Sequence, residues 1–188
     1  MTPPAEAPAV AGGSELDISR LLDFLTVVAA ELPRRIILVG AGGTAMTLLQ
    51  VKPSTRDIDF TGPREDIASF RRALKGIPHG WKIDLWPDGQ VFSEFLPSDY
   101  LRRSRRVQDL GNVDLRALHP VDIVVTKLAR LDRRDEQDIE ACIRSFGLTR
   151  AAVTKRAGRV QHAGSEARYQ HNLELVVRRF FASKSSSP

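Results

Sequence analysis

A short apolar run that leads into a glycine turn constrains the fold of this chain more than any other segment. The run is Ile36-Ile37-Leu38-Val39, and Gly40-Ala41-Gly42-Gly43 follows it directly. Four consecutive apolar residues before such a turn indicate a short buried strand. Residues 45–49 are then predicted to form a short helix, and residues 56–60 a second strand. The segment therefore reads as strand, glycine turn, helix and strand in close succession.

The second of these strands carries two acidic residues, Asp57 and Asp59. Alternate residues of a strand point to the same face, so both carboxylates are expected to project together while Ile58 and Phe60 enter the core. Paired carboxylates suit Mg²⁺, which prefers oxygen ligands and usually shares its coordination shell with substrate phosphates. The pair predicts a site for hard divalent cations.

Further strands and helices complete the expected architecture. Residues 81–86 alternate with period two and predict a third strand with Asp84 at its centre, and residues 105–118 suggest a hairpin about Gly111. Helices are expected from near Ser14 or Asp17 to Leu32, after Pro63, from Pro120 through Leu131, over 134–146 with Gly147 as cap, after Thr149, and over 169–180. The fold class is α+β (mixed α/β): a small mixed sheet with flanking helices, followed by a wholly helical C-terminal bundle.

Composition and length limit the domain organisation, the compartment and the partners of the chain. The 188 residues suit one domain, which we divide into a core over 15–118 and a helical part over 119–182, with disordered tails at 1–14 and 183–188. One cysteine, Cys142, fits a reducing compartment. Since the sequence contains neither a run of about 20 apolar residues nor a signal peptide, it predicts a cytoplasmic protein without membrane contact. The net charge of +5 favours polyanionic partners.

Together these elements form a specific chemical arrangement. Backbone N–H groups of a glycine turn at a helix start can hold phosphate oxygens, and Thr44 adds a hydroxyl donor. With Asp84 beside Asp57 and Asp59, two metal ions could activate an attacking hydroxyl and stabilise a leaving pyrophosphate. These are the parts that nucleotidyl transfer requires.

Residues 38–60 resemble the signature of the DNA polymerase beta-like nucleotidyltransferase superfamily, in its minimal branch. That signature is an apolar strand, a glycine pair, a short helix and Asp-x-Asp, and here the spacer covers residues 44–56. Downstream, Thr126-Lys127-Leu128-Ala129-Arg130 and Arg133-Arg134-Asp135-Glu136-Gln137-Asp138 resemble elements of the abortive-infection-type nucleotidyltransferases. Several members of that group are toxins of toxin–antitoxin pairs.

The resemblance implies a role for each matching position. Gly42, Gly43 and Thr44 would hold phosphate, although the Gly-Ala-Gly-Gly turn leaves the choice of glycine pair open. Asp57 and Asp59 would bind two Mg²⁺ ions with Asp84 as third acid. Lys127 would contact the triphosphate with Arg130 and Arg134 on the same helical face, and Asp135 or Asp138 would be a catalytic or positioning carboxylate. The implied partners are an NTP, an acceptor such as tRNA, protein or a small molecule, and an antitoxin protein.

Other interpretations of the same residues stay open. Asp84 could be exposed on an edge strand, Lys127 and Arg130 could be surface cations at a helix end, and Asp135 and Asp138 could be helix caps. The run Arg102-Arg103-Ser104-Arg105-Arg106 could contact RNA or simply be solvated. The alternatives to an enzyme are a non-catalytic nucleotide-binding member of the fold and a small basic RNA-binding protein.

Overall fold

A computed structural model describes residues 15–181, and the predictions of disordered tails at 1–14 and 183–188 lie outside the described residues. The centre is a five-stranded mixed sheet in the order β5-β4-β2-β9-β8. Its strands are β2 (Ile36–Gly40), β4 (Ile58–Gly62), β5 (Ile83–Pro87), β8 (Arg105–Asp109) and β9 (Val113–Ala117). β2 pairs parallel with β9 and antiparallel with β4, β4 pairs parallel with β5, and β8 closes the other edge antiparallel to β9. The mixed sheet of the predicted fold class is confirmed.

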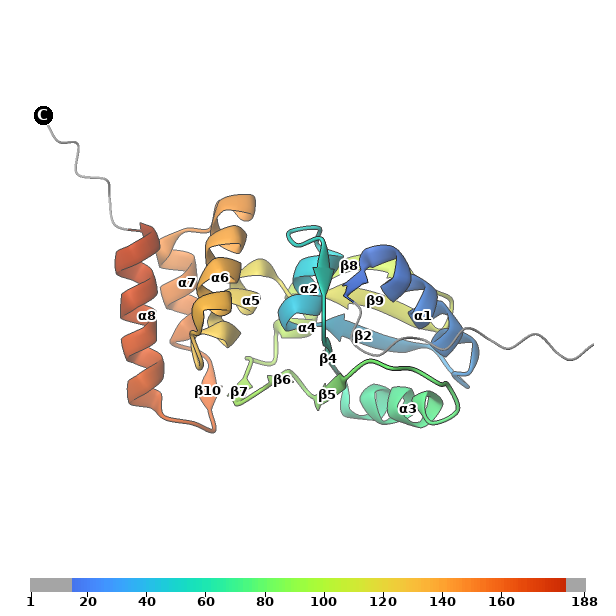
Figure 1. Cartoon of the computed structure of the whole chain (residues 1–188). Helices are drawn as coiled ribbons and strands as arrows, with labels where there is room; N and C mark the ends of the chain where they lie inside the picture. Colours follow the sequence, from blue (N-terminus) through green and yellow to red (C-terminus); the bar gives the residue numbers. More distant parts are fainter. Residues whose placement is uncertain (1–14, 182–188) are drawn as a thin grey trace, which may run out of the picture.

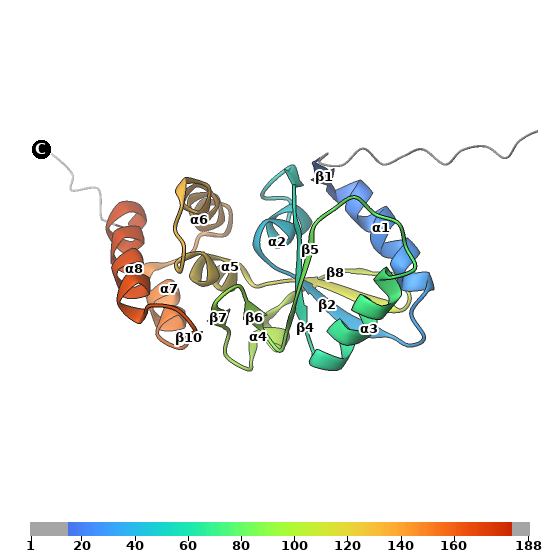
Figure 2. The same cartoon turned by 60° about the horizontal axis from the view of Figure 1, so that its bottom comes forward.

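Helices of the N-terminal half cover this sheet (Figures 1 and 2). α3 (Arg64–Leu74) packs on β2, β4 and β5 beside α1 (Ile18–Ala30), and α2 (Gly42–Leu48) contacts β2, β4 and β9. α1 begins at Asp17, whose carboxylate caps the helix by accepting from the Arg20 N–H at 2.9 Å. A two-stranded ribbon of β1 (Leu16–Asp17) and β3 (Ser54–Thr55) joins the start of the chain to the segment before β4.

The C-terminal half is a bundle of helices beside the sheet (Figure 1). It contains α5 (Pro120–Lys127), α6 (Arg133–Phe146), α7 (Arg150–Ala157) and α8 (Glu166–Phe181), and α5 also contacts α2 of the sheet half. Gly147 ends α6 in the left-handed conformation at φ 59°, and the Thr149 hydroxyl caps α7, both as predicted. The Tyr169 hydroxyl of α8 donates to the Val125 carbonyl at 3.0 Å, so α8 is fastened to α5.

The expectation of a wholly helical C-terminal part is wrong at one place. β10 (Gln161–His162) pairs with β7 (Glu94–Phe95), which in turn pairs with β6 (Gln90–Val91), and the three form a small sheet between the two halves. α4 (Tyr100–Arg103) leads from this sheet into β8. A strand of two residues is too short to show an alternation pattern, so these strands could not be predicted from the sequence.

The helix expected from Pro120 through Leu131 is shorter than predicted. α5 ends at Lys127, and Leu131 takes the left-handed conformation at φ 51°. The reason lies in the next residues, because Asp132 and Asp135 form a capping box that starts α6 at Arg133. Lys127, Arg130 and Arg134 therefore do not lie on one continuous helix.

Candidate functional site

The predicted second strand begins later than expected, at Ile58, which changes how its two acids are held. The Thr44 and Thr55 hydroxyls both donate to the carbonyl of Asp57, at 3.2 and 2.9 Å, and so fix the backbone just before β4. Asp57 lies in a bend before β4 and is exposed, whereas Asp59 lies inside β4 and is buried. Ile58 and Phe60 are fully buried, as predicted.

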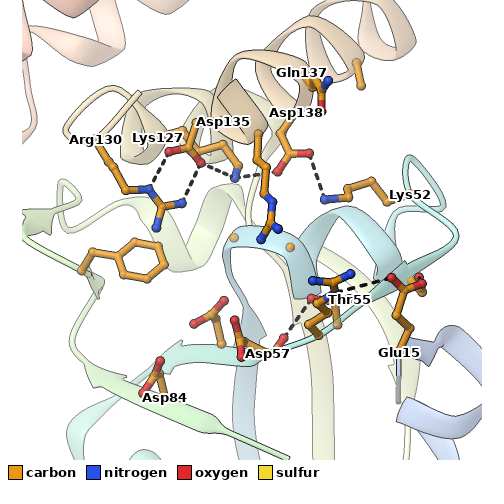
Figure 3. Close-up of a pocket in the computed structure, with 18 of the residues that line it drawn as sticks. Glu15, Lys52, Thr55, Asp57, Asp84, Lys127, Arg130, Asp135, Gln137 and Asp138 are labelled. Carbon is orange, nitrogen blue, oxygen red and sulfur yellow. Dashed lines mark hydrogen bonds and ion pairs between the residues drawn. The ribbon is translucent and has the colours of Figure 1, made fainter. Parts of the chain in front are cut away.

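Asp84 is placed beside Asp59 by strand pairing. The two residues are direct partners in the parallel β4–β5 ladder, so their side chains lie on the same face of the sheet. β5 is an edge strand, and Lys82, the residue just before it, donates from Nζ to Asp84 Oδ2 at 2.7 Å. Asp57, Asp59 and Asp84 all line one pocket of about 630 Å³, hereafter the main pocket (Figure 3).

The glycine turn lies against these acids. Gly42 adopts a left-handed φ of 49°, and a side chain there would begin 3.0 Å from Asp59 Oδ2. A side chain on Gly43 would begin 2.7 Å from the Thr55 hydroxyl, whereas one on Gly40 would meet Leu48 in the core. Gly42 and Gly43 both line the main pocket. Of the glycine pairs left open by the sequence, Gly42-Gly43 is the one that faces the acids.

Thr44 has a different position from the one predicted. Its side chain is fully buried, and its hydroxyl accepts from the Asp59 N–H at 2.9 Å while it donates to the Asp57 carbonyl. Thr44 does not line the main pocket. Its hydroxyl is thus committed to fixing the backbone of the two acids, and the structure corrects the expectation that it is a phosphate donor.

Basic residues occupy the opposite wall of the main pocket, around the break between α5 and α6 (Figure 3). Lys127 is 7% exposed, and its Nζ contacts Asp135 Oδ1 at 3.0 Å and Asp138 Oδ2 at 2.7 Å. Arg130 donates to Asp135 at 2.8 Å, and Lys52 contacts Asp138 at 3.0 Å. These five side chains form a continuous ion network.

Charge in this network follows from the pairing. Burial disfavours the charged form of Lys127, but the carboxylates of Asp138 and Asp135 outweigh it and raise the lysine pKa. Burial also opposes ionisation of Asp135, yet hydrogen bonds from Arg130 and the charge of Lys127 lower its pKa. Asp135 additionally completes the capping box of α6, so the predicted cap role holds alongside its place in the pocket. Lys127 is therefore a charged lysine held in place on a rigid element.

The pocket also contains cations that the sequence interpretation did not single out as site residues. Lys52, Arg56 and Lys82 line it from connecting segments between the strands and helices. Lys127, Arg130 and Arg134 reach the same pocket even though the predicted helical face is interrupted. The loop cations occur in segments without periodicity, so no pattern could have marked them.

Burial and like charge act together on Asp59. Burial is the largest cause, followed by the charges of Asp84 and Asp57, and together they raise the pKa of Asp59 to about 7. A carboxyl group with this environment is unfavourable to ionise in the absence of a cation. Among the described residues 15–181, no three His, Cys, Asp or Glu side chains already form a closed metal-binding cluster.

We expect this acid to make the metal-free protein lose stability as pH rises. A group whose pKa is raised by folding stabilises fully below its unfolded pKa, here 3.8, and loses that contribution as pH passes about 7. The pKa shift sets an upper limit of about 4 kcal/mol on the contribution of this group to the free energy of unfolding. About 3 kcal/mol of that contribution is lost between pH 5 and pH 8. In EDTA, Asp59→Asn should therefore raise the melting temperature relative to wild type more at pH 8 than at pH 5.

The matched control is Asp23→Asn on the exposed face of α1. Its difference from wild type should be the same at both pH values. An Asp59→Asn difference that is equally independent of pH would show that Asp59 ionises normally in the folded protein.

Similarity to known proteins identifies the family of this chain. No curated protein matches the chain in sequence. The crystal structure of ANT(2″)-Ia in complex with adenylyl-2″-tobramycin is similar at 11% identity and a TM-score of 0.47, covering 86% of this chain and 99% of that one. A family profile described as "Nucleotidyltransferase of unknown function (DUF6036)" matches residues 18–181, which is most of the chain. The chain therefore belongs to this nucleotidyltransferase family and is an enzyme of that class.

Proposed function

We propose that the protein is a Mg²⁺-dependent enzyme that transfers NMP from an NTP to a hydroxyl group of an acceptor and releases pyrophosphate. One observation carries the proposal: three acids and a set of basic residues face each other across a single pocket, with Gly42 and Gly43 between them. Acids on one wall suit metal ions, and cations on the other suit a triphosphate. Nucleotidyl transfer requires both in one place.

The metal would be held by Asp57, Asp59 and Asp84. Their carboxylates supply the oxygen ligands that Mg²⁺ prefers, and the missing side chain of Gly42 leaves Oδ2 of Asp59 accessible from the turn. The raised pKa of Asp59 also indicates a carboxyl group that gains from a nearby cation. When bound, two Mg²⁺ ions would supply activation of the acceptor hydroxyl and stabilisation of the leaving pyrophosphate. The Lys82 ammonium contacts Asp84 at 2.7 Å and neutralises its charge.

The triphosphate would lie between the glycine turn and the basic wall. The first backbone N–H groups of a helix have no partners within that helix, so those at Gly42 and Gly43 are suited to donate hydrogen bonds to phosphate oxygens. Lys127 and Arg130 would contact the phosphates from the other side, with Arg134 beside them. Their positive charge would stabilise the negative charge that develops on the departing phosphates.

Asp135 and Asp138 are best explained as positioning residues. Both are buried and both contact Lys127, so they hold its ammonium in the pocket rather than reach the reacting atoms themselves. Thr44 has a parallel function on the acid side, where it fixes the backbone at Asp57 and Asp59.

Three finer proposals accompany this function. Because the main pocket is lined from both halves, we propose that residues 15–118 and 119–182 act as one domain. Convergence of Lys127, Asp135 and Asp138 on the Asp57–Asp59 pocket supports the abortive-infection-type branch. We also propose a cytoplasmic location, because the one cysteine, Cys142, fits a reducing compartment. Within residues 15–181, no helix has the length and apolar character needed to cross a membrane.

The test is a screen of four labelled NTPs against total RNA, total protein and small hydroxyl compounds in the presence of Mg²⁺. We expect one NTP to leave a covalent label on one acceptor class, and EDTA to abolish it. Nucleotide binding without any label would instead favour a non-catalytic nucleotide-binding protein, whereas salt-sensitive RNA binding without nucleotide binding would favour an RNA-binding one.

A toxin role has its own readout. If the protein is the toxin of a pair, induced expression should stop bacterial growth, and the double variant Asp57→Ala, Asp59→Ala should not. Equal growth inhibition by both proteins would separate any toxicity from nucleotidyl transfer and remove the reason to expect an antitoxin partner.

A further inference from the structure

A second cavity of about 390 Å³ adjoins the main pocket on the side of Arg130, and we call it the side cavity. Four residues line both spaces: Phe92, Lys127, Arg130 and Asp135. A ligand whose charged end lies in the main pocket can therefore extend into the side cavity. The residues lining only the side cavity include Trp86 of β5, Glu94 of β7, Thr126 of α5 and Arg168 of α8.

Glu94 is the most unusual group in this cavity. The residue is 1% exposed, and the Ser93 hydroxyl donates to its Oε1 at 2.6 Å. Its Oε2 has no hydrogen-bond partner among the described residues. Buried carboxyl oxygens are nearly always paired, because an unpaired one loses its hydration without compensation. Nothing in the catalytic arrangement above uses Glu94, so its free oxygen requires another explanation.

Two aromatic residues stand beside Glu94. Trp86 and Phe92 have ring centroids 5.7 Å apart, and the Arg130 guanidinium lies 5.8 Å from the Phe92 ring centroid. The Trp86 indole N–H is also buried without a partner among residues 15–181. Phe92 itself takes a left-handed φ of 56°, a conformation that bulky residues rarely adopt and that concentrates at ligand-binding positions.

These groups define what could fill the cavity. The ligand should have a flat body that packs against aromatic rings, a donor for Glu94 Oε2 and an acceptor for the indole N–H. A nucleobase has all three, because it stacks through its π-face and carries donors and acceptors along its edge. An acceptor substrate bearing an ammonium group fits less well, because three cations, Lys127, Arg130 and Arg168, line the cavity against two carboxylates, Glu94 and Asp135. Of these two carboxylates, Asp135 is already paired with Lys127 and Arg130.

We infer that the side cavity binds the nucleobase of the NTP, with Glu94 and Trp86 contacting its edge and Phe92 its face. The inference rests on the proposed function, because it requires the triphosphate to lie in the main pocket. It adds the residues that recognise the nucleoside end of the substrate. Glu94 and Trp86 would then determine which of the four NTPs the enzyme prefers.

The test measures equilibrium binding of each NTP and of inorganic tripolyphosphate, which has no base, to the full-length protein with Mg²⁺. We expect Glu94→Met to weaken the most tightly bound NTP roughly tenfold, the effect of one lost hydrogen bond, and to leave tripolyphosphate binding unchanged. Trp86→Phe should weaken the same NTP severalfold. In wild type, the NTP but not tripolyphosphate should quench tryptophan fluorescence.

Trp81→Phe is the matched control, because Trp81 packs on Phe24 with ring centroids 5.1 Å apart and does not line the side cavity. The NTP should still quench the fluorescence of the Trp81→Phe variant, which retains Trp86, whereas it should not quench the fluorescence of the Trp86→Phe variant. If Glu94→Met does not fold, Trp86→Phe and Glu94→Gln carry the same comparison.

Each other outcome has a distinct meaning. NTP affinity that is unchanged in both Glu94→Met and Trp86→Phe would overturn the inference while the proposed function stands. A raised KM for the acceptor with unchanged NTP affinity would also overturn it and assign the cavity to the acceptor. Absence of both NTP and tripolyphosphate binding in the wild type would overturn the proposed function and the inference together.

Discussion

Replacing Asp57 and Asp59 together with alanine should slow nucleotide transfer at least about a thousandfold, because the main ligands of the proposed metal ions are lost. Asp59 projects from β4 beside its ladder partner Asp84, and Asp57 lies in the bend just before it. The measurement is the initial rate with the NTP and acceptor identified in the screen, at saturating Mg²⁺. Because the raised pKa of Asp59 disfavours its charge, the variant should be at least as stable as wild type in EDTA.

The control for this prediction is Asp23→Ala, which removes an exposed carboxylate from α1 and should leave the rate unchanged. A double variant that retained more than a tenth of the wild-type rate would show that these carboxylates do not hold the catalytic metal. The stability measurement separates that result from loss of folded protein.

The largest effect on stability is expected from Lys127→Met. The lysine neutralises Asp135 and Asp138, which are 1% and 7% exposed, and its removal leaves carboxylates buried without their main counter-ion. Breaking a buried pair in this way typically costs about 3 to 5 kcal/mol of unfolding free energy. Arg130 and Lys52 still contact the two acids, so the lower end of that range is expected. Urea denaturation at pH 7 measures the change.

Two further variants show whether the loss has this cause. Lys155→Met removes an exposed lysine from α7 and should stay within about 0.5 kcal/mol of wild type. Adding Asp138→Asn to Lys127→Met should recover part of the lost stability, since it removes one of the unpaired charges. A Lys127→Met protein as stable as wild type would show that the lysine is not needed to stabilise the two acids and would contradict the prediction.

Local patterns predicted the parts of the fold that depend on neighbouring residues. The strand at Ile36, the caps at Gly147 and Thr149, and the hairpin at Gly111 all follow from apolar runs and turn chemistry, and each is present. Side chains alternate along each strand, so Asp59 and Asp84 lie on the same face of the sheet once their strands pair in this register. These features need only a few consecutive residues to be specified.

Most of the missed features depend on contacts between distant segments, and the break between α5 and α6 is the local exception. The α5–α6 break arises where a capping box at Asp132 competes with an apolar stripe, and the stripe alone predicted one helix. β7 and β10 are two residues long and exist because they pair with each other. Thr44 matches the family pattern, yet only the folded structure shows that its hydroxyl is used by the backbone of Asp57 and Asp59. The side cavity, which Glu94 of β7 lines, was likewise invisible in the sequence.

The ladder pairing of Asp59 with Asp84 makes the third acid sensitive to chain length. Side chains alternate along a strand, so sliding β5 by one residue would turn Asp84 to the opposite face and bring Ile83 or Leu85 towards Asp59. β5 is held on one side only, and the connection that sets its register runs from the end of α3 at Leu74 to Ile83. We therefore expect a single-residue insertion in that surface connection to abolish activity, although every side chain proposed for catalysis is still present.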